Sequence, residues 1–293
     1  MPDLAYVNGW IGPLGAARVS VLDRGFLFAD GVYEVLRTYG GRPFMLGAHL
    51  RRLRQSLRGL QLPAPLSSAR LEALILDLVR QSGYAEARIY IQVTRGSPPL
   101  RQHVFPRGVP PTLVVYVESA PAPPLRQQQR GVRVITLPDW RWKHCHLKTI
   151  VLLPNVLARQ AAARAGAAEA ILLGPGQVVR EASSSNVFIV RRGVLRTHPL
   201  GSEILPGVSR QVTLELARAA GLVVREERFR LRSLLQSDEV LLSSTSLEVT
   251  PVVRVDGAVI GSGVPGPVAR QLLARFHARS RGESWRRGGQ GAW

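Results

Sequence analysis

Apolar residues in the first 120 positions follow two rhythms, one typical of helices and one typical of strands. Leu46, Leu50, Leu53, Leu57 and Leu60 recur at alternating steps of four and three positions, which places them on one face of a helix. A second helix is predicted after Ser67-Ser68 and ends at Gly83. Strands are predicted over 17–22, over 88–94, over 112–118 and on both sides of the turn Gly40-Gly41 within 32–46, with a Pro-rich loop over 96–111.

Beyond residue 130 helices and strands alternate again. Strands are predicted over 132–137, 170–173, 187–190, 194–197, 239–242 and 252–260, the last one bent at Asp256-Gly257, and helices over 155–165, 208–220 and 267–278. The segment 120–124 is rich in proline, which continues neither helix nor strand, so it is the best linker candidate. We therefore expect two α/β domains, an N-terminal one over 1–120 and a C-terminal one over 131–280. A Pro-rich linker over 121–130 would join them, and a disordered basic tail over 281–293 would follow.

Composition excludes several classes of protein. The chain of 293 residues is 45% hydrophobic and 20% charged, which is typical of a globular protein. Its one cysteine, Cys145, makes neither an internal disulfide nor a cysteine-based zinc site. No apolar run reaches the roughly 18 residues of a membrane span, and no secretory pattern opens the chain. A cytoplasmic enzyme without a membrane partner is expected.

The formal charge of +19 raises the question of a nucleic-acid partner. The arginines, however, are spread along the whole chain, mostly as single residues on the polar side of apolar patterns. There is no zinc finger, RNA-binding sheet motif or stripe of basic and aromatic residues. We therefore expect no nucleic acid, and a basic nucleic-acid-binding protein is kept only as the non-enzyme alternative.

Lysine is conspicuously scarce: of the 39 basic residues only Lys143 and Lys148 are lysines. Unlike arginine, lysine can lose a proton and attack a carbonyl carbon to form an imine. The alternative is that two lysines survived by chance. Between them, His144 and His146 alternate on a possible strand, but a third ligand is missing from the segment, so no metal site is expected.

Three polar segments could surround a small ligand. Residues 181–188 read Glu-Ala-Ser-Ser-Ser-Asn-Val-Phe and offer a carboxylate, hydroxyls and an amide, although the same residues suit a plain turn between two strands. In 205–210 a helix is predicted to begin at Val208, where unpaired amide groups beside Ser209 suit a phosphate. Residues 243–246 add hydroxyls at the end of a predicted strand. Each signal is weak alone.

Together these residues resemble a known family. From Tyr6 to Phe276 the chain resembles the fold-type IV pyridoxal-phosphate enzymes (the class IV aminotransferase family), and within them the D-amino acid aminotransferases. The carrying segments are Asp23-Arg24-Gly25, Gly31-Val32-Tyr33-Glu34-Val35, His49-Leu50-Arg51-Arg52-Leu53, Val93-Thr94-Arg95-Gly96, Lys148-Thr149, Glu181 to Phe188, Gly207-Val208-Ser209-Arg210 and Val249-Thr250-Pro251. The resemblance implies two α/β domains with pyridoxal 5′-phosphate in the cleft between them.

The resemblance also implies roles for single residues. Lys148 would hold the cofactor as an imine and, once displaced by the substrate, would move a proton between substrate and cofactor. Glu181 would face the pyridine nitrogen. The other implied cofactor contacts are Arg52, Ser184, Ser185, Asn186, Leu205, Val208, Ser209, Ser244 and Thr245.

Substrate choice is implied by a separate set of residues. D-amino acid aminotransferases carry an arginine, one further residue and a histidine in a loop that grips the substrate carboxylate, and Arg101-Gln102-His103 matches this pattern. Tyr33 would complete the grip. In the family the loop comes from the other subunit, which implies a homodimer. The expected reaction is ping-pong transfer of the amino group from a D-amino acid, such as D-alanine, to a 2-oxo acid, such as 2-oxoglutarate.

Alternatives of the same fold remain open at this point. They are a branched-chain L-amino acid aminotransferase, an aminodeoxychorismate lyase and an R-selective amine transaminase. The branched-chain enzymes usually lack the arginine–histidine pair, and an R-amine transaminase would need a pocket without a fixed carboxylate grip.

Overall fold

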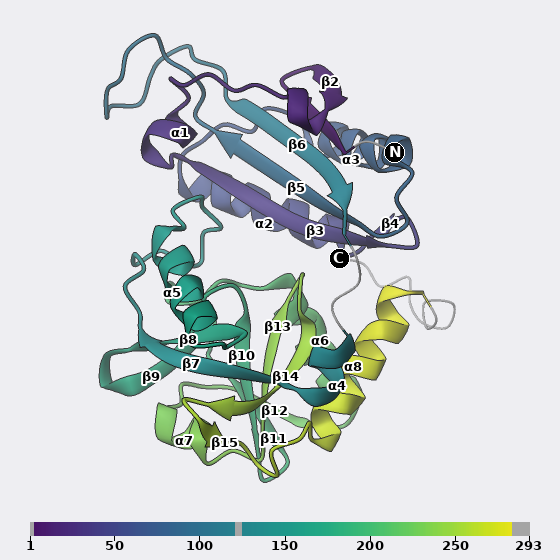
Figure 1. Cartoon of the computed structure of the whole chain (residues 1–293). Coiled ribbons are helices and arrows are strands. Elements are labelled where there is room, and N and C mark those ends of the chain that lie inside the picture. Colours follow the sequence, from purple (N-terminus) through teal and green to yellow (C-terminus); the bar gives the residue numbers. More distant parts are fainter. Residues whose placement is uncertain (1–2, 121–124, 283–293) are drawn as a thin grey trace. The chain divides into compact units, whose positions relative to one another are not determined.

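The computed structural model describes residues 3–120 and 125–282, and these residues divide into two compact units (Figure 1). Of the described residues, unit 1 comprises 3–120 and Leu147–Leu152, and unit 2 comprises 125–146 and 153–282. Each unit mixes helices with a sheet, which confirms the expected α/β class. Lys148 therefore belongs to unit 1, whereas the sequence led us to expect it within the C-terminal domain.

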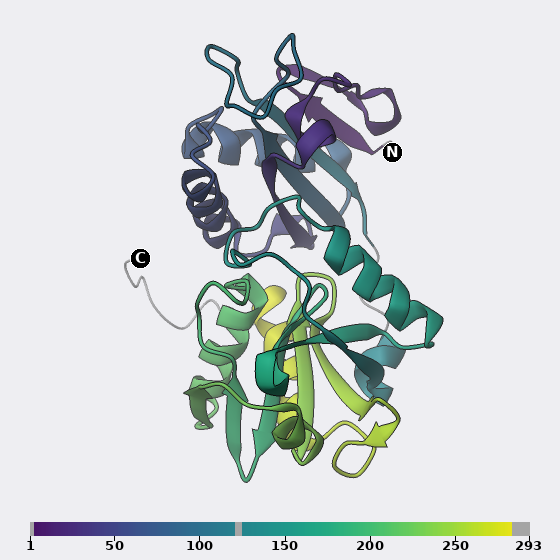
Figure 2. The ribbon, with the colours of Figure 1, turned by 90° about the vertical axis from the view of Figure 1, so that its left-hand side faces the viewer.

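Unit 1 is a six-stranded sheet with two long helices on one face (Figure 2). The strand order is β2-β1-β6-β5-β3-β4, and the long neighbours β3, β5 and β6 pair antiparallel. Its elements are β1 (Leu4–Val7), β2 (Trp10–Pro13), α1 (Arg24–Phe28), β3 (Gly31–Tyr39), β4 (Arg42–Pro43), α2 (Leu46–Gly59), α3 (Ser68–Ser82), β5 (Ala87–Thr94) and β6 (Thr112–Ser119), with a short 3₁₀ turn over Leu14–Ala16.

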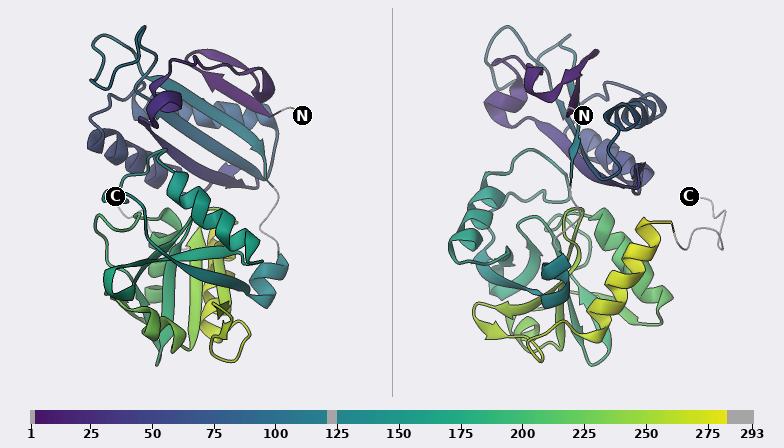
Figure 3. Two further views of the ribbon diagram at one scale, coloured as in Figure 1. Left: turned by 60° about the vertical axis from the view of Figure 1, so that its left-hand side comes forward. Right: turned by 45° about the vertical axis from the view of Figure 1, so that its right-hand side comes forward.

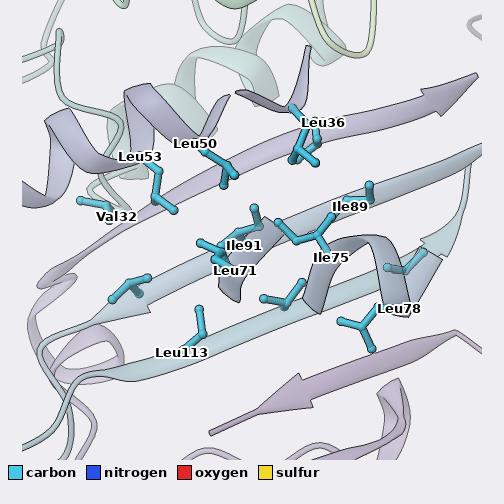
Figure 4. Close-up of a cluster of buried hydrophobic side chains, with 14 of the residues drawn as sticks. Val32, Leu36, Leu50, Leu53, Leu71, Ile75, Leu78, Ile89, Ile91 and Leu113 are labelled. Atoms are coloured by element: carbon cyan, nitrogen blue, oxygen red, sulfur yellow. The ribbon is translucent and has the colours of Figure 1, made fainter. Parts of the chain in front are cut away.

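The leucine stripe of α2 faces the core of unit 1, as its spacing predicts. Leu50 and Leu53 pack on Val32 and Leu36 of β3, and Ile75 of α3 joins the same buried cluster (Figure 4). Burying a leucine or isoleucine side chain stabilises the fold by roughly 1.5–3 kcal/mol. Because side chains alternate along a strand, β3 turns Val32, Glu34 and Leu36 toward the helices, and Tyr33 lies on the opposite face. Glu34 is thus the one carboxylate that β3 carries into the helix-covered side.

Unit 2 is built around a nine-stranded sheet of order β12-β11-β10-β13-β14-β7-β8-β9, with β15 paired to β14. Helix α5 packs on β7 and β8, while α6 and α8 pack side by side against β13 and β14 (Figure 3). Its elements are α4 (Leu125–Arg130), β7 (Val132–Pro138), α5 (Leu153–Arg164), β8 (Glu169–Gly174), β9 (Val178–Ala182), β10 (Asn186–Arg191), β11 (Val194–Thr197), α6 (Val208–Ala219), β12 (Val223–Glu226), α7 (Leu231–Leu235), β13 (Glu239–Ser244), β14 (Glu248–Val255), β15 (Ala258–Val259) and α8 (Pro267–Ser280), with a 3₁₀ turn over Pro175–Gln177.

Two predictions of local structure are wrong. Residues 17–22 form no strand: Val19 and Val21 are exposed, and a turn in which the Asp23 amide donates to the Ser20 carbonyl takes its place. Residues 125–130, expected in the linker, form α4, which packs on β14. The rest of the linker candidate, 121–124, and the tail from 283 lie outside the described residues.

The described residues contain neither a candidate membrane span nor a candidate metal site. In 3–120 and 125–282 no helix is both long and apolar enough to cross a membrane. No group of three or more histidine, cysteine, aspartate or glutamate side chains there is placed to hold a metal ion. His144 and His146 lie in a segment without strand structure, with ring centroids 5.8 Å apart.

Candidate active site

Lys148 is fixed against the edge of the sheet in unit 1. The segment Leu147–Leu152 runs beside β3, where the Tyr33 amide donates to the Lys148 carbonyl over 3.0 Å and the Ile150 amide donates to the Gly31 carbonyl over 3.1 Å. The Lys148 amide donates to Ser56 Oγ of α2 over 2.9 Å. Its Nζ lies 4.2 Å from the centroid of the Tyr33 ring. Lys148 is partly buried, whereas Lys143 in unit 2 is exposed.

Beside Lys148 lies a buried triad of Glu34, His49 and Arg52. Arg52 donates from Nε and Nη2 to the two carboxylate oxygens of Glu34, each over 2.7 Å, and His49 Nδ1 lies 2.7 Å from Glu34 Oε2. Glu34 lies on β3, and His49 and Arg52 lie three positions apart on α2. Residues at this spacing share one face of a helix, so both side chains reach the Glu34 carboxylate. This geometry fixes the orientation of the Arg52 guanidinium.

The charges of this triad are set by burial and by its own members. Burial would raise the pKa of Glu34, but the Arg52 charge and the hydrogen bonds from Arg52 and His49 lower it to about 2. Burial lowers the pKa of His49, the Glu34 carboxylate opposes this, and the charges of Arg52 and Lys148 lower it further. Glu34 is therefore ionised, His49 is neutral, and His49 donates its Nδ1 proton to the carboxylate.

Arg101 and His103 both contact one aromatic ring. In the exposed loop between β5 and β6, the Arg101 Cζ lies 4.7 Å from the Phe28 ring centroid, and the His103 ring centroid lies 5.1 Å from it. Phe28 is the last residue of α1. Tyr33 lies elsewhere on the sheet, where its ring stacks on that of Tyr90, 5.7 Å away. In unit 1 the two loop residues thus share a contact with Phe28, whereas Tyr33 lies in a row of stacked tyrosines next to Lys148.

Glu181 is the buried carboxylate of unit 2, at the end of β9. It accepts hydrogen bonds from Asn186 Nδ2 over 2.9 Å and from the Leu205 amide over 3.0 Å, and it forms an ion pair with Arg141. Burial raises the pKa of Glu181, and the Arg141 charge opposes this without offsetting it. Arg141 is held in turn by Asp139 through Nη2, over 2.9 Å. The carboxylate is therefore rigidly oriented and sensitive to any further cation near it.

The serine triplet binds a different carboxylate. Ser183, Ser184 and Ser185 all direct their hydroxyls at the buried side chain of Glu169 on β8; for Ser184 the distance from Oγ to Glu169 Oε2 is 2.6 Å. The Ser184 amide donates to the same oxygen over 3.2 Å. Of the polar residues predicted in this segment, the structure thus joins Asn186 to Glu181 and ties the serines to Glu169.

Helix α6 begins at Val208 without a side-chain cap. Its N-cap is Gly207, where a Cβ atom would lie 2.0 Å from Asn186 Oδ1, so a larger residue there would displace the Asn186 side chain. The first amide groups of an α-helix have no partner within the helix, and here these belong to Val208 and Ser209. On β13, which pairs Ser243 with Asn186, the buried Ser243 Oγ has no partner among the described residues. Ser244 Oγ accepts from the Leu247 amide over 3.1 Å.

Comparison with known proteins decides the family. The sequence pattern of the family described as Amino-transferase class IV matches residues 31–255. The chain belongs to the class IV aminotransferases. A D-alanine aminotransferase of Bacillus licheniformis is 39% identical over 265 residues, covering 90% of this chain and 93% of the relative. A D-alanine aminotransferase of Listeria innocua is 41% identical over 271 residues, covering 92% and 93%.

Solved structures support the same family. The branched-chain amino acid aminotransferase of Escherichia coli superposes with a TM-score of 0.90 at 26% identity, covering 99% of this chain and 98% of the other. A Mycobacterium tuberculosis aminotransferase in its PLP-bound form superposes with a TM-score of 0.84 at 26% identity, covering 96% and 99%. This class IV aminotransferase is accordingly a fold-type IV enzyme whose cofactor is pyridoxal 5′-phosphate.

The residues of this aminotransferase fit that cofactor. Lys148 supplies a fixed primary amine, Glu181 an oriented carboxylate, and α6 an uncapped N-terminus that suits a phosphate. The buried hydroxyl of Ser243, which pairs with Asn186 across the sheet, has no hydrogen-bond partner among the described residues. A buried polar atom of this kind is available to bind a polar ligand.

Some residues of the aminotransferase were missed in the sequence. Glu34, His49 and Arg24 lie inside the segments that carry the family resemblance, but no role was given to them. Arg141 and Glu169 carry no signal in the sequence: Arg141 is one of many arginines, and Glu169 precedes an ordinary apolar strand. Their roles appear only when the fold pairs them with Glu181 and the serines.

Proposed function

We propose that this aminotransferase moves the amino group of a D-amino acid, such as D-alanine, to a 2-oxo acid, such as 2-oxoglutarate. The supporting observation is the pair Arg101 and His103, whose side chains both contact the Phe28 ring. A guanidinium binds a carboxylate through two parallel hydrogen bonds, and a neighbouring imidazole adds a third donor. The relatives named D-alanine aminotransferase are also more similar in sequence than the branched-chain enzyme, at 39% and 41% against 26%.

Lys148 would be the catalytic residue. When bound, pyridoxal 5′-phosphate supplies a carbonyl carbon that links to amines and a ring that accepts electron density from the substrate Cα. Lys148 would hold the cofactor and then carry a proton to and from the substrate Cα. Its main chain is fixed by Tyr33 and Ser56, and its ammonium lies on the Tyr33 ring, so the side chain is directed while its terminal amine can still move.

The other residues would bind and orient. Glu181 would accept a hydrogen bond from the protonated pyridine nitrogen. The hydrogen bonds that Glu181 accepts from Asn186 and Leu205 fix the orientation of its carboxylate for this role. The amides of Val208 and Ser209, with Arg52, Ser244 and Thr245, would hold the phosphate, and Leu205 would pack against the ring. Ser184 and Ser185 would act by keeping the turn before Asn186 in place, because their hydroxyls are bound to Glu169.

The proposed function implies a homodimer, because in the family the loop that binds the substrate carboxylate comes from the other subunit. Arg101 and His103 would then serve the active site of the partner subunit. The observation that suits this is that both residues are exposed in a loop of unit 1.

The experiment that tests the function begins with the two lysines. The purified holoenzyme is reduced with borohydride, digested and analysed by mass spectrometry. We expect the cofactor to be fixed on Lys148 and Lys148→Ala to lose at least 1,000-fold, roughly, in kcat. Lys143→Ala is the matched control and keeps its activity, because Lys143 is exposed. Label on Lys143 would overturn the mechanism.

Paired assays with D-alanine, L-alanine and L-leucine test the substrate. Activity with D-alanine is expected, and activity confined to the L-acids would show a branched-chain L-amino acid aminotransferase instead. That second candidate is favoured by the TM-score of 0.90 to the Escherichia coli branched-chain enzyme. The two candidates share the lysine and the cofactor, so the assays separate them independently of the labelling.

A further inference from the structure

The loop that carries Arg101 and His103 has no helix or strand of its own, yet its two ends are tied together. The buried Asp23 carboxylate accepts from Thr94 Oγ1 over 2.9 Å and from Thr112 Oγ1 over 2.6 Å, so one side chain joins the strand before the loop to the strand after it. Gly96 has a φ of +86° and lies so close to Pro110 that a Cβ atom would be 2.1 Å from its carbonyl oxygen. The base of the loop is therefore closed.

Arg24, the next residue after Asp23, holds the tip of the loop. It is 3% exposed, and its Nε is paired with Asp30 over 2.8 Å. Its Nη1 and Nη2 donate to the consecutive carbonyls of Gln102, His103 and Val104, the bond from Nη2 to His103 being 3.1 Å long. One guanidinium thus fixes the main chain on both sides of the His103 side chain.

Two side chains at the tip of the loop contact α1, the helix that also carries Arg24. Phe28 lies one turn after Arg24 on α1 and contacts both Arg101 and His103. On the other side, Arg95 lies 3.6 Å from the Phe105 ring centroid and is paired with the same Asp30 over 2.8 Å. Figure 2 shows α1 and the loop at the same end of the sheet. Arg24 and Phe28 of α1 thus contact the Arg101–His103 segment through both its main chain and its side chains.

We propose that Arg24 is a positioning residue for the substrate carboxylate: it sets the place of Arg101 and His103 by binding the three carbonyls around them. This inference rests on the proposed function, in which Arg101 and His103 grip that carboxylate. A planar guanidinium offers donors in several fixed directions, and a lysine in its place would keep the charge opposite Asp30 but lose the fork. A displacement of the gripping groups by about 1 Å weakens binding strongly.

The test compares Arg24→Lys with Arg37→Lys. Arg37 is a matched control, since it is also buried, pairs with Glu86 over 3.1 Å and donates to the Ala120 carbonyl, but it lies at the other end of β3 from the loop. In the holoenzyme we expect Arg24→Lys to raise the KM for D-alanine roughly tenfold with kcat within about twofold of wild type. Arg37→Lys keeps the wild-type KM. Trypsin should also cut Arg24→Lys faster after Arg101 and Arg107.

A combined variant shows whether Arg24 acts through the two loop residues. Arg101→Ala should raise the KM for D-alanine, Arg101→Ala with His103→Ala should raise it further, and adding Arg24→Lys to that pair should raise it no further. The positioning role would be overturned if the KM increases of Arg24→Lys and of the loop substitutions multiplied in the combined variant. A fall in kcat at constant KM in Arg24→Lys would overturn it as well. Should Arg24→Lys fail to fold, Asp30→Asn removes the charge that holds the Arg24 Nε, and an unchanged KM there counts against the proposal.

The same measurements separate this proposal from the function on which it rests. A raised KM in Arg101→Ala beside an unchanged KM in Arg24→Lys overturns only the positioning role. An unchanged KM in Arg101→Ala removes the carboxylate grip itself, and the role of Arg24 with it.

Discussion

At the scale of single residues, the most consequential group is the Glu34–His49–Arg52 triad, because it places an ionised carboxylate in the core of unit 1. Glu34 is fully buried and is compensated by one arginine and one neutral histidine. Removing one partner of a buried ion pair leaves the other charge uncompensated, which costs about 3–5 kcal/mol. The triad beside Lys148 is thus also a point where folding depends on pH.

Glu34→Gln tests this dependence. The pKa of Glu34 falls from an ordinary 4.5 to about 2 on folding, so its ionisation stabilises the fold above pH 4.5 and this stabilisation is lost as the pH falls toward 2. Glu34→Gln should be less stable than wild type at pH 7 by roughly 3 kcal/mol, and the gap should close on acidification. Urea unfolding at pH 7, 4.5 and 3 measures it.

The control for this prediction is Glu118→Gln, which breaks the surface pair with Arg88 and should cost less than about 1 kcal/mol at each pH. His49 acts in the same direction as Glu34, since its lowered pKa makes protonation below its ordinary value of 6.5 unfavourable in the folded state. A stability gap for Glu34→Gln that stays constant from pH 7 to pH 3 would contradict the ionised triad.

At the scale of elements, the start of α6 depends on the close approach of Gly207 to Asn186. The backbone angles of Gly207, φ −65° and ψ 133°, suit any residue, so space and not conformation requires glycine here. Asn186 donates to both Glu181 and the Leu205 carbonyl. A displaced Asn186 side chain would therefore disturb both the carboxylate predicted to bind the pyridine nitrogen and the start of α6, which is predicted to bind the phosphate.

Gly207→Ala is therefore expected to weaken cofactor binding. Displacing Asn186 should raise the Kd of pyridoxal 5′-phosphate at least tenfold, roughly, and cost about 1–3 kcal/mol of stability. The Kd is measured by absorbance titration of the apoenzyme. Gly201→Ala is the matched control, because a Cβ atom there meets no other atom within 4 Å. Equal Kd values for the two variants would show that the contact does not matter.

The elements also show why the sequence was informative in some places and silent in others. The helices α2, α3, α6 and α8 follow from apolar spacing, and the end of α3 follows from Gly83, since one face of each helix is buried against a sheet. The strand predicted over 17–22 has the alternation of a strand but finds no neighbour to pair with. Alternation describes a half-buried surface only where another strand supplies the hydrogen bonds.

The candidate site divides in the same way. Lys148 and Glu181 could be predicted because their segments resemble those of a family, and Lys148 also because lysine is so scarce in this chain. Arg141, Glu169 and the loop contacts of Arg24 could not, because each acts through a partner 14 to 80 positions away along the chain. Such pairs exist only once the strands are in register.

At the scale of the whole molecule, the proposed homodimer makes one sharp prediction. Two inactive or weakened chains should complement each other if the Arg101 loop serves the partner's site. A mixed dimer of Lys148→Ala and Arg101→Ala would then contain one site with an intact lysine from one chain and an intact loop from the other. The second site would have neither.

The expected result is a wild-type KM for D-alanine with about half the wild-type kcat per dimer. If each loop instead serves its own chain, the only intact lysine stands beside the altered loop, and the mixed dimer keeps the high KM of Arg101→Ala. The dimers are prepared by co-expression with two different affinity tags and purified on both in sequence. Sedimentation at the assay concentration shows whether the dimer exists at all, and a monomer with full activity would exclude a loop shared between subunits.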